Sequence, residues 1–89
     1  MTVLVAYAGR TGSAEAIAWI VAQHLRDAGL AVDLRPCEQA ADAWKYDGVV
    51  LGSAVHGHHW DRAAVEYLRA QAPDLAERPT WLYESGSTW

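Results

Sequence analysis

The fold is decided by one stretch near the N-terminus, Tyr7-Ala8-Gly9-Arg10-Thr11-Gly12-Ser13-Ala14-Glu15. Apolar residues 3–7 precede it, as in a buried strand, and after it apolar side chains recur at helical spacing: Ile17, Ala18, Val21, Ala22, Leu25 and Ala28. A loop between a strand and a helix N-terminus presents amide donors and the positive end of the helix dipole, which favours an anion such as phosphate. Ser13 is the expected N-cap and Glu15 suits the first turn. The same stretch is equally typical of a capped turn without a ligand.

Length and composition indicate one small domain, and they exclude several classes of partner. The chain has 89 residues, of which 52% are hydrophobic, and a net charge of −4 without a basic stripe, which argues against nucleic acid. Its single cysteine, Cys37, excludes an internal disulfide and fits a reducing cytoplasm. We see neither a signal peptide nor an apolar run that could span a bilayer, so we expect a cytoplasmic protein.

Strands and helices are predicted to alternate along the chain. Residues 2–7 form a central strand, and residues 13–28 form a helix that ends at Gly29. Residues 30–35 alternate in polarity, as in an edge strand that ends at Pro36, and residues 38–44 form one or two helical turns. Residues 47–53 form a third, central strand, and a loop over residues 54–60 follows it.

The last third of the sequence predicts one more helix and one more strand. Asp61 is the expected N-cap of a helix with apolar Ala64, Val65, Leu68 and Ala72 on one side, and Pro73 is expected to end it. Residues 80–84 form the fourth strand. The fold class is therefore α/β: a three-layer, doubly wound, parallel sheet of four strands in the order 2-1-3-4. In that order a ligand crevice opens at the carboxyl ends of the first and third strands.

Several parts of the sequence resemble the flavodoxin family, and most closely the flavodoxin-domain proteins related to menaquinone-dependent protoporphyrinogen oxidases. The matching segments are residues 3–7 with 11–18, the Tyr46-Asp47-Gly48-Val49-Val50-Leu51-Gly52-Ser53-Ala54-Val55 stretch, and residues 78–83. The resemblance implies non-covalent binding of FMN and transfer of electrons or hydride. It also implies that residues 1–89 are a single flavodoxin-like domain that is incomplete at the C-terminus, roughly the first half of a flavodoxin domain, because the family continues with a helix, a strand and a last helix.

The resemblance assigns the cofactor-binding residues by position. The ribityl phosphate would be held by Arg10, Thr11, Gly12 and Ser13, the isoalloxazine ring would be flanked by Val55, His56, Gly57, His58 and Trp60, and its far side would be approached by Ser85, Gly86 and Ser87. The sequence departs from the family at Gly9 and Ala14, where hydroxyl residues are usual, and at His56, where an aromatic residue is usual. Two missing hydrogen bonds to phosphate would weaken FMN binding by a factor of roughly 10² or more, and the charge of Arg10 would offset part of the loss.

An open fourth strand has a further consequence. Its unpaired backbone groups would invite another chain, and Trp81, Tyr83 and Trp89 would leave apolar area exposed. We therefore expect a homodimer through the edge of that strand, or a marginally stable monomer. If flavin binds, the partner would be a redox protein or a quinone-like acceptor. The alternative function is a flavin-free fragment that serves protein association.

Several residues keep more than one interpretation. Trp60 would stack on a flavin face or pack against the following helix. The His56, His58 and His59 cluster would lie near flavin, hold a metal or be an exposed loop. Trp19 and Trp44 are expected to pack in the interior, Cys37 to have no redox role, and Asp47 to lie at the amino end of its strand. The sequence contains no recognisable catalytic triad, acid–base carboxylate pair or Walker lysine, so any redox chemistry would be that of the flavin.

Overall fold

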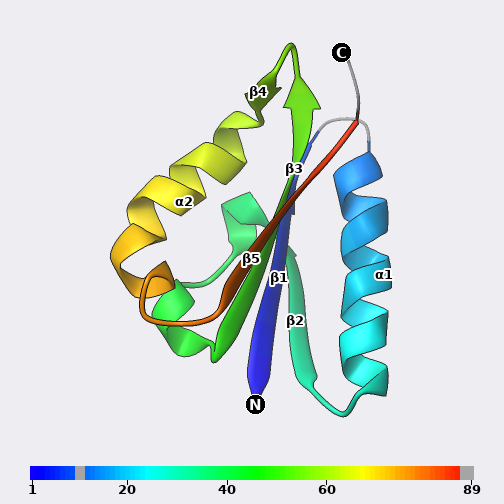
Figure 1. The fold of residues 1–89 in the computed structure, drawn as a ribbon, viewed down its shortest axis with the longest axis vertical. Coiled ribbons are helices and arrows are strands. Elements are labelled where there is room, and N and C mark those ends of the chain that lie inside the picture. The colour runs from blue at the N-terminus through cyan, green and yellow to red at the C-terminus, as the bar shows by residue number, and fades with distance from the viewer. Residues whose placement is uncertain (10–11, 87–89) are drawn as a thin grey trace.

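The computed structural model describes residues 1–9 and 12–86, which form three layers (Figure 1). A twisted sheet lies between helix α1 (Ser13–Asp27) on one face and helix α2 (Arg62–Leu75) on the other. Helices on both faces are expected where the central strands are apolar along their whole length. The predicted three-layer α/β fold is confirmed.

Four parallel strands make up most of the sheet. Strands β1 (Thr2–Ala8) and β3 (Gly48–His56) are central, and β2 (Ala31–Pro36) and β5 (Thr80–Ser85) flank them in the order β2-β1-β3-β5. This is the predicted order 2-1-3-4, because β5 is the predicted fourth strand. The carboxylate of Asp47 accepts a hydrogen bond from the amide of Thr2, so Asp47 lies at the amino end of β3 as expected.

The predicted loop over residues 54–60 is wrong, because these residues continue the sheet. Strand β3 runs on to His56 and turns back into a fifth, two-residue strand, β4 (His59–Trp60), which pairs antiparallel with the end of β3. In Figure 1 this hairpin projects beyond the rest of the sheet at the carboxyl end of β3.

The two helices meet the sheet differently. In α1 the buried side chains are Ala14, Ala18 and Ala22, one turn apart, and such small residues let the helix lie close to the strands. Asp61 caps α2 as predicted, because its Oδ1 accepts a hydrogen bond from the amide of Ala63. The prediction that Pro73 ends this helix is wrong, since α2 continues to the buried Leu75. The predicted helical turns after β2 are two 3₁₀ turns, Cys37–Gln39 and Ala43–Lys45.

Each face of the sheet has its own core. The α2 face is centred on Leu4, Val49 and Leu51, and the α1 face on Val3, Val5 and Val50. Trp19 and Trp44, by contrast, are more than half exposed, so the prediction that they pack in the interior is wrong. Trp44 lies instead beside Lys45, whose Nζ is 5.6 Å from the centre of the indole ring. No helix in the described part of the chain is long and apolar enough to cross a membrane.

Candidate functional site

The candidate site lies at the carboxyl edge of the sheet, where β1 and β3 end side by side. Ala8 at the end of β1 is in register with Ser53 of β3. Just beyond, Gly9 lies so close to β3 that a Cβ atom on it would be 2.7 Å from the Cβ of Ala54. Only glycine at position 9 therefore lets the chain pass this close to Ala54 of β3 as it leaves β1. Because α1 follows β1 on one face and α2 follows β3 on the other, this edge is a topological switch point, where a ligand crevice is expected.

The N-terminus of α1 opens directly onto this edge. Gly12, not the predicted Ser13, is the N-cap, and its φ of 82° is a left-handed conformation that glycine adopts most readily. The first helical hydrogen bond joins the amide of Ala16 to the carbonyl of Gly12, so the amides before Ala16 face the loop. Ser13 is the first residue of the helix. Arg10 and Thr11, both predicted to hold phosphate, lie outside the described residues.

The end of β5 lies close to the N-terminus of α1. The hydroxyl oxygens of Ser13 and Ser85 are 3.2 Å apart and share a hydrogen bond, although 72 positions separate them in the sequence. Gly86, with a φ of 81°, follows; a Cβ atom on it would be 3.8 Å from the carbonyl oxygen of Val55. Ser13, Val55, Ser85 and Gly86, predicted from distant parts of the sequence, are thus brought together. Ser87 lies outside the described residues.

The hairpin that holds the remaining predicted residues has a tight two-residue turn. Gly57 and His58 both have positive φ angles, 56° and 68°, while Val55 pairs with Trp60 and His56 with His59. In the part of the chain that the structure describes, no three His, Cys, Asp or Glu side chains are grouped so that they could hold a metal ion.

The hairpin side chains of Trp60 and His56 contact different parts of the structure. Trp60 packs against the core on the α2 face, and its Nε1 donates a hydrogen bond to Oε2 of Glu84 at 3.1 Å, which ties the hairpin to β5. The structure thus shows the packing interpretation of Trp60, while stacking on a flavin stays a prediction. Nε2 of His56 is buried and lies 3.7 Å from Oδ2 of Asp61.

Two residues that were not predicted as site residues, Ser53 and Tyr83, support the site. Ser53 is fully buried; its hydroxyl accepts a hydrogen bond from the amide of Asp61 and donates one to the carbonyl of Ala54. This fixes the return of the chain from the hairpin into α2. Tyr83 donates a hydrogen bond of 2.7 Å to the carbonyl of Ala14 in the first turn of α1. Burial raises the pKa of Tyr83 to about 12, so the tyrosine hydroxyl is protonated at neutral pH and can donate this hydrogen bond.

Cys37 directly follows β2, whose last residue, Pro36, is in register with Tyr7 of β1, and it is unsuited to thiol chemistry. It is buried in the core on the α2 face. Burial, followed by the charge of Glu38, raises its pKa to about 12, so the reactive thiolate is scarce at neutral pH. The absence of a redox role for Cys37 stays a prediction.

A fold with this order and a crevice at the switch point defines the doubly wound α/β class. Within that class, the model of the flavodoxin domain matches residues 4–88, so the chain belongs to the flavodoxin domain family. No curated protein sequence matches the chain. The narrower resemblance to proteins related to protoporphyrinogen oxidases stays a prediction.

Solved structures show the same fold. A short-chain flavodoxin associated with a non-canonical PDU bacterial microcompartment is 24% identical, with a TM-score of 0.86 over 98% of this chain and 62% of its own. A flavodoxin of Streptococcus pneumoniae TIGR4 is 27% identical, with a TM-score of 0.76 over 98% of this chain and 63% of its own. The chain thus spans about three fifths of these relatives. A Fusobacterium nucleatum flavodoxin mutant bound to flavin mononucleotide is 14% identical, with a TM-score of 0.76 over 93% of this chain and 49% of its own.

Proposed function

We propose that the chain binds FMN at the carboxyl edge of the sheet and acts as an electron-transfer or oxidoreductase domain. The phosphate would lie at the N-terminus of α1, and the ring between the β3–β4 hairpin and the end of β5. The observation that carries the proposal is the 3.2 Å approach of Ser13 and Ser85, because it brings the N-terminus of α1 and the end of β5 together at the carboxyl edge of the sheet. Membership of the flavodoxin domain family supports it.

The residues present fit an anion at this position. Among the described residues, and apart from the neighbours of Gly12 in the chain, no atom lies within 4 Å of a Cβ atom built on Gly12, which leaves room there for a ligand. Helix N-termini bind phosphate through backbone amides and the positive end of the helix dipole, without any particular side chain. Gly9 and Ala14 supply no hydroxyl groups, and Ala14 is buried against the sheet. Phosphate binding would therefore depend on backbone amides and on the predicted contacts of Arg10, Thr11 and Ser13.

The chain's own groups would hold and shield the cofactor. Bound FMN would supply the electron-transfer chemistry, and no side chain of the crevice is needed as a catalytic acid or base. The hairpin, fixed by the Trp60–Glu84 hydrogen bond, would exclude water from one side of the ring. We propose a redox protein or a quinone-like molecule as the electron-transfer partner, and the cytoplasm as the place of action, where the single buried cysteine stays reduced.

The variant Ser13→Asp tests where the phosphate lies. A carboxylate in the first turn of a helix is favourable to the helix dipole by about 0.3–1 kcal/mol, so the protein should keep its melting temperature. The same carboxylate would repel the FMN phosphate and should raise the dissociation constant for FMN at least tenfold, as followed by quenching of flavin fluorescence.

The matched control is Ser13→Asn, which has nearly the same size as the aspartate variant but no charge. It loses the same contact with Ser85 and should weaken FMN binding several-fold less than Ser13→Asp does. Folded variants that both bind FMN as tightly as the unmodified protein would show that the phosphate does not lie at the N-terminus of α1.

A further inference from the structure

The side chain of His56 contains a buried nitrogen without a hydrogen-bond partner. His56 is the last residue of β3, and its Nε2 atom is buried. Within the described part of the chain, no donor or acceptor forms a hydrogen bond with this nitrogen. A buried polar atom that is left unsatisfied destabilises the arrangement that buries it. The side chain as a whole is 41% exposed, so the ring can still exchange protons with solvent.

A carboxylate oxygen of Asp61 lies near this nitrogen and is held in place. Oδ2 of Asp61 is 3.7 Å from Nε2 of His56, which is beyond hydrogen-bond distance. The other oxygen, Oδ1, caps α2 by accepting the amide hydrogen of Ala63, and the amide of Asp61 donates to the hydroxyl of Ser53. Because Asp61 is fixed at the start of α2, the gap closes only if the end of β3 moves toward the helix.

The charge of the imidazole decides whether closing this gap is favourable. A neutral imidazole has one N–H group and one acceptor nitrogen, whereas both nitrogens of a protonated ring are donors. A protonated ring beside a carboxylate forms a charge-assisted hydrogen bond, which is about twice as strong as a neutral one. Histidine is the side chain that changes between these two states near neutral pH. The charge of His56 is therefore coupled to its distance from Asp61.

We propose that His56 and Asp61 form a pH-sensitive latch on the β3–β4 hairpin, residues 55–60. When His56 takes up a proton from solvent, its Nε2–H group donates to Oδ2 of Asp61 and draws the hairpin onto the start of α2. When the proton is lost, Nε2 has no partner and the hairpin is held less firmly. The consequence for the cofactor rests on the proposed function: the hairpin is one wall of the proposed flavin site, so FMN should bind more tightly when the latch is closed.

Other titratable or charged groups lie on the elements around His56. They are His58 and His59 of the hairpin, Arg62 and Glu66 of α2, Glu84 of β5, and Cys37 and Glu38 of the 3₁₀ turn after β2. Glu84 accepts the hydrogen bond from Trp60, and Arg62 is paired with Glu66. The thiol of Cys37 is neutral near pH 7, because burial raises its pKa to about 12. In the described part of the chain, Asp61 is the carboxylate that pairs with His56.

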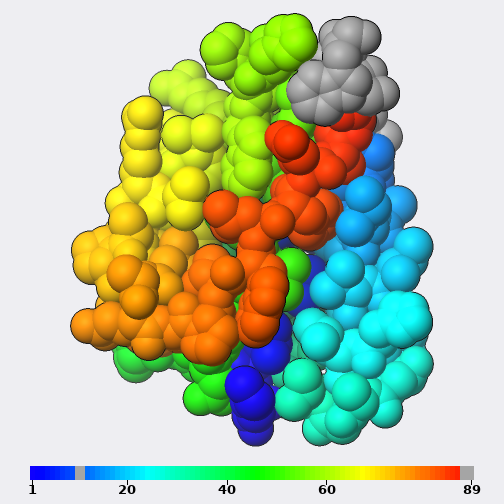
Figure 2. Space-filling model, in the orientation of Figure 1, coloured from blue at the N-terminus to red at the C-terminus, as the bar shows by residue number. Residues whose placement is uncertain are grey.

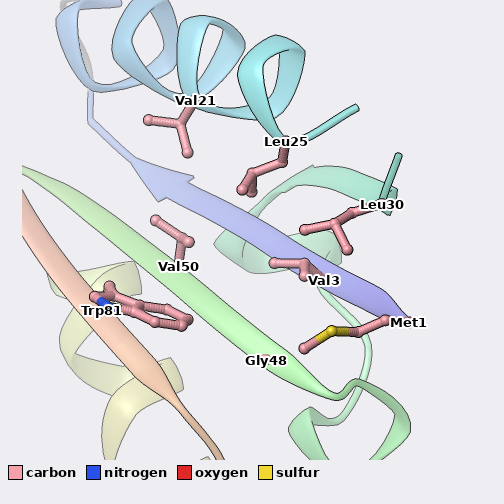
Figure 3. A pocket seen from close by; sticks show the side chains of 8 residues that line it. All are labelled: Met1, Val3, Val21, Leu25, Leu30, Gly48, Val50 and Trp81. Atoms are coloured by element: carbon pink, nitrogen blue, oxygen red, sulfur yellow. The ribbon is translucent and has the colours of Figure 1, made fainter. Parts of the chain in front are cut away.

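The latch lies at the opposite end of β3 from an apolar hollow on the α1 face. In Figure 2 the light green hairpin forms the top of the molecule, above the start of α2. The hollow, shown in Figure 3, has a volume of about 160 Å³ and is lined by Met1, Trp81 and Gly48, among others. Gly48 is the first residue of β3 and His56 is the last. An apolar molecule in the hollow would therefore not contact the latch.

The first test measures the His56–Asp61 interaction in the ligand-free protein. His56→Gln keeps a polar side chain that cannot be charged, and Asp61→Asn keeps a good N-cap without the negative charge. Urea denaturation of the unmodified protein, the two single variants and the double variant measures their coupling at about pH 6 and about pH 8. The effects on the unfolding equilibrium constant should be non-additive by roughly threefold at the lower pH, as for a partly exposed ion pair, and additive at the higher pH.

The matched control is His59→Gln, which removes a histidine from the same hairpin. His59 is exposed and lies directly opposite His56 in the ladder. The effects of His59→Gln and Asp61→Asn should be additive at both pH values. The latch would be overturned by additive effects of His56→Gln and Asp61→Asn at the lower pH, or by a coupling of the same size at both pH values.

The second test asks whether the latch regulates the proposed flavin site. The dissociation constants for FMN of the unmodified protein and of Asp61→Asn are compared at the same two pH values by quenching of flavin fluorescence. Their ratio at each pH cancels the ionisation of the FMN phosphate, which is the same for both proteins. The unmodified protein should bind FMN about twofold to threefold more tightly at the lower pH and equally at the higher pH, since the effect cannot exceed the coupling in the ligand-free protein.

The outcomes separate the latch from the proposed function. Equal ratios at both pH values would show that the latch does not regulate FMN binding. Failure of the unmodified protein to bind FMN would reject the proposed function and this regulation with it. The measurements on the ligand-free protein would still decide whether His56 and Asp61 form the latch, because they involve no flavin.

Discussion

The ring of Tyr83 lies directly on Gly52, so closely that a Cβ atom on Gly52 would be 1.9 Å from Cζ of the tyrosine. Only glycine at this point of β3 leaves room for the ring to cross the sheet from β5. By crossing, the tyrosine places its hydroxyl 2.7 Å from the carbonyl oxygen of Ala14 in the first turn of α1. Gly52 and Tyr83 therefore act together to hold the N-terminus of α1, which is the expected phosphate-binding position, against the end of β5.

The Gly52–Tyr83 pair should be strongly coupled in stability. Gly52→Ala forces the ring away and should lower the free energy of unfolding by about 1–3 kcal/mol, as overpacking does in other cores. In a Tyr83→Ala background the added methyl group has space, so the same change should cost little. Urea denaturation of the two single variants and the double variant measures the coupling. Additive effects would show that the ring does not lie on Gly52.

Alkaline pH should destabilise the fold through its buried tyrosines. Burial raises the pKa of Tyr83 to about 12, and burial with a hydrogen bond to Asp33 raises that of Tyr46 to about 12, from an ordinary value of 10.0. The pKa of Cys37 is likewise raised, from 9.0 to about 12, so ionisation of this thiol also destabilises the fold at alkaline pH. Because the unfolded chain loses these protons first, the free energy of unfolding should be constant from pH 7 to about 8.5 and should decrease between about pH 9 and pH 12.

Urea denaturation at a series of pH values measures this dependence. A Tyr83→Phe variant has one titrating group fewer, so its stability should decrease less steeply with pH. Equal slopes in both proteins would contradict the assigned role of Tyr83.

The sheet order could be predicted from the sequence because central and edge strands have different patterns of polarity. β1 and β3 are apolar along their length, and β2 alternates in polarity, so the burial of each strand follows from its pattern. The hairpin after β3 could not be predicted, since its second turn residue is His58, and glycine, asparagine or aspartate is the usual signal for two left-handed residues. Helix α2 passes Pro73 because burial of Leu75 offsets the hydrogen bond that proline cannot make.

The position of the candidate site could be predicted from the sequence, but the contacts that hold its segments together could not. Its glycines and serines follow from the loops at the carboxyl ends of β1, β3 and β5. The contact of Ser13 with Ser85 and the path of Tyr83 over Gly52 depend on three-dimensional packing of distant segments, for which no local pattern exists. Trp19 lies outside the apolar stripe of its helix, so its exposure agrees with the helical spacing, whereas Trp44 lies in a short 3₁₀ turn that has no periodic pattern.

The most direct test of FMN binding at the α1 N-terminus is a parallel titration of the protein with FMN and with riboflavin, followed by quenching of flavin fluorescence. The two ligands differ only in the phosphate group. The account predicts that FMN binds with a dissociation constant near micromolar or lower and that riboflavin binds at least tenfold more weakly, a difference of about 1.4 kcal/mol or more. Equal binding of both ligands, or no binding of FMN, would contradict it.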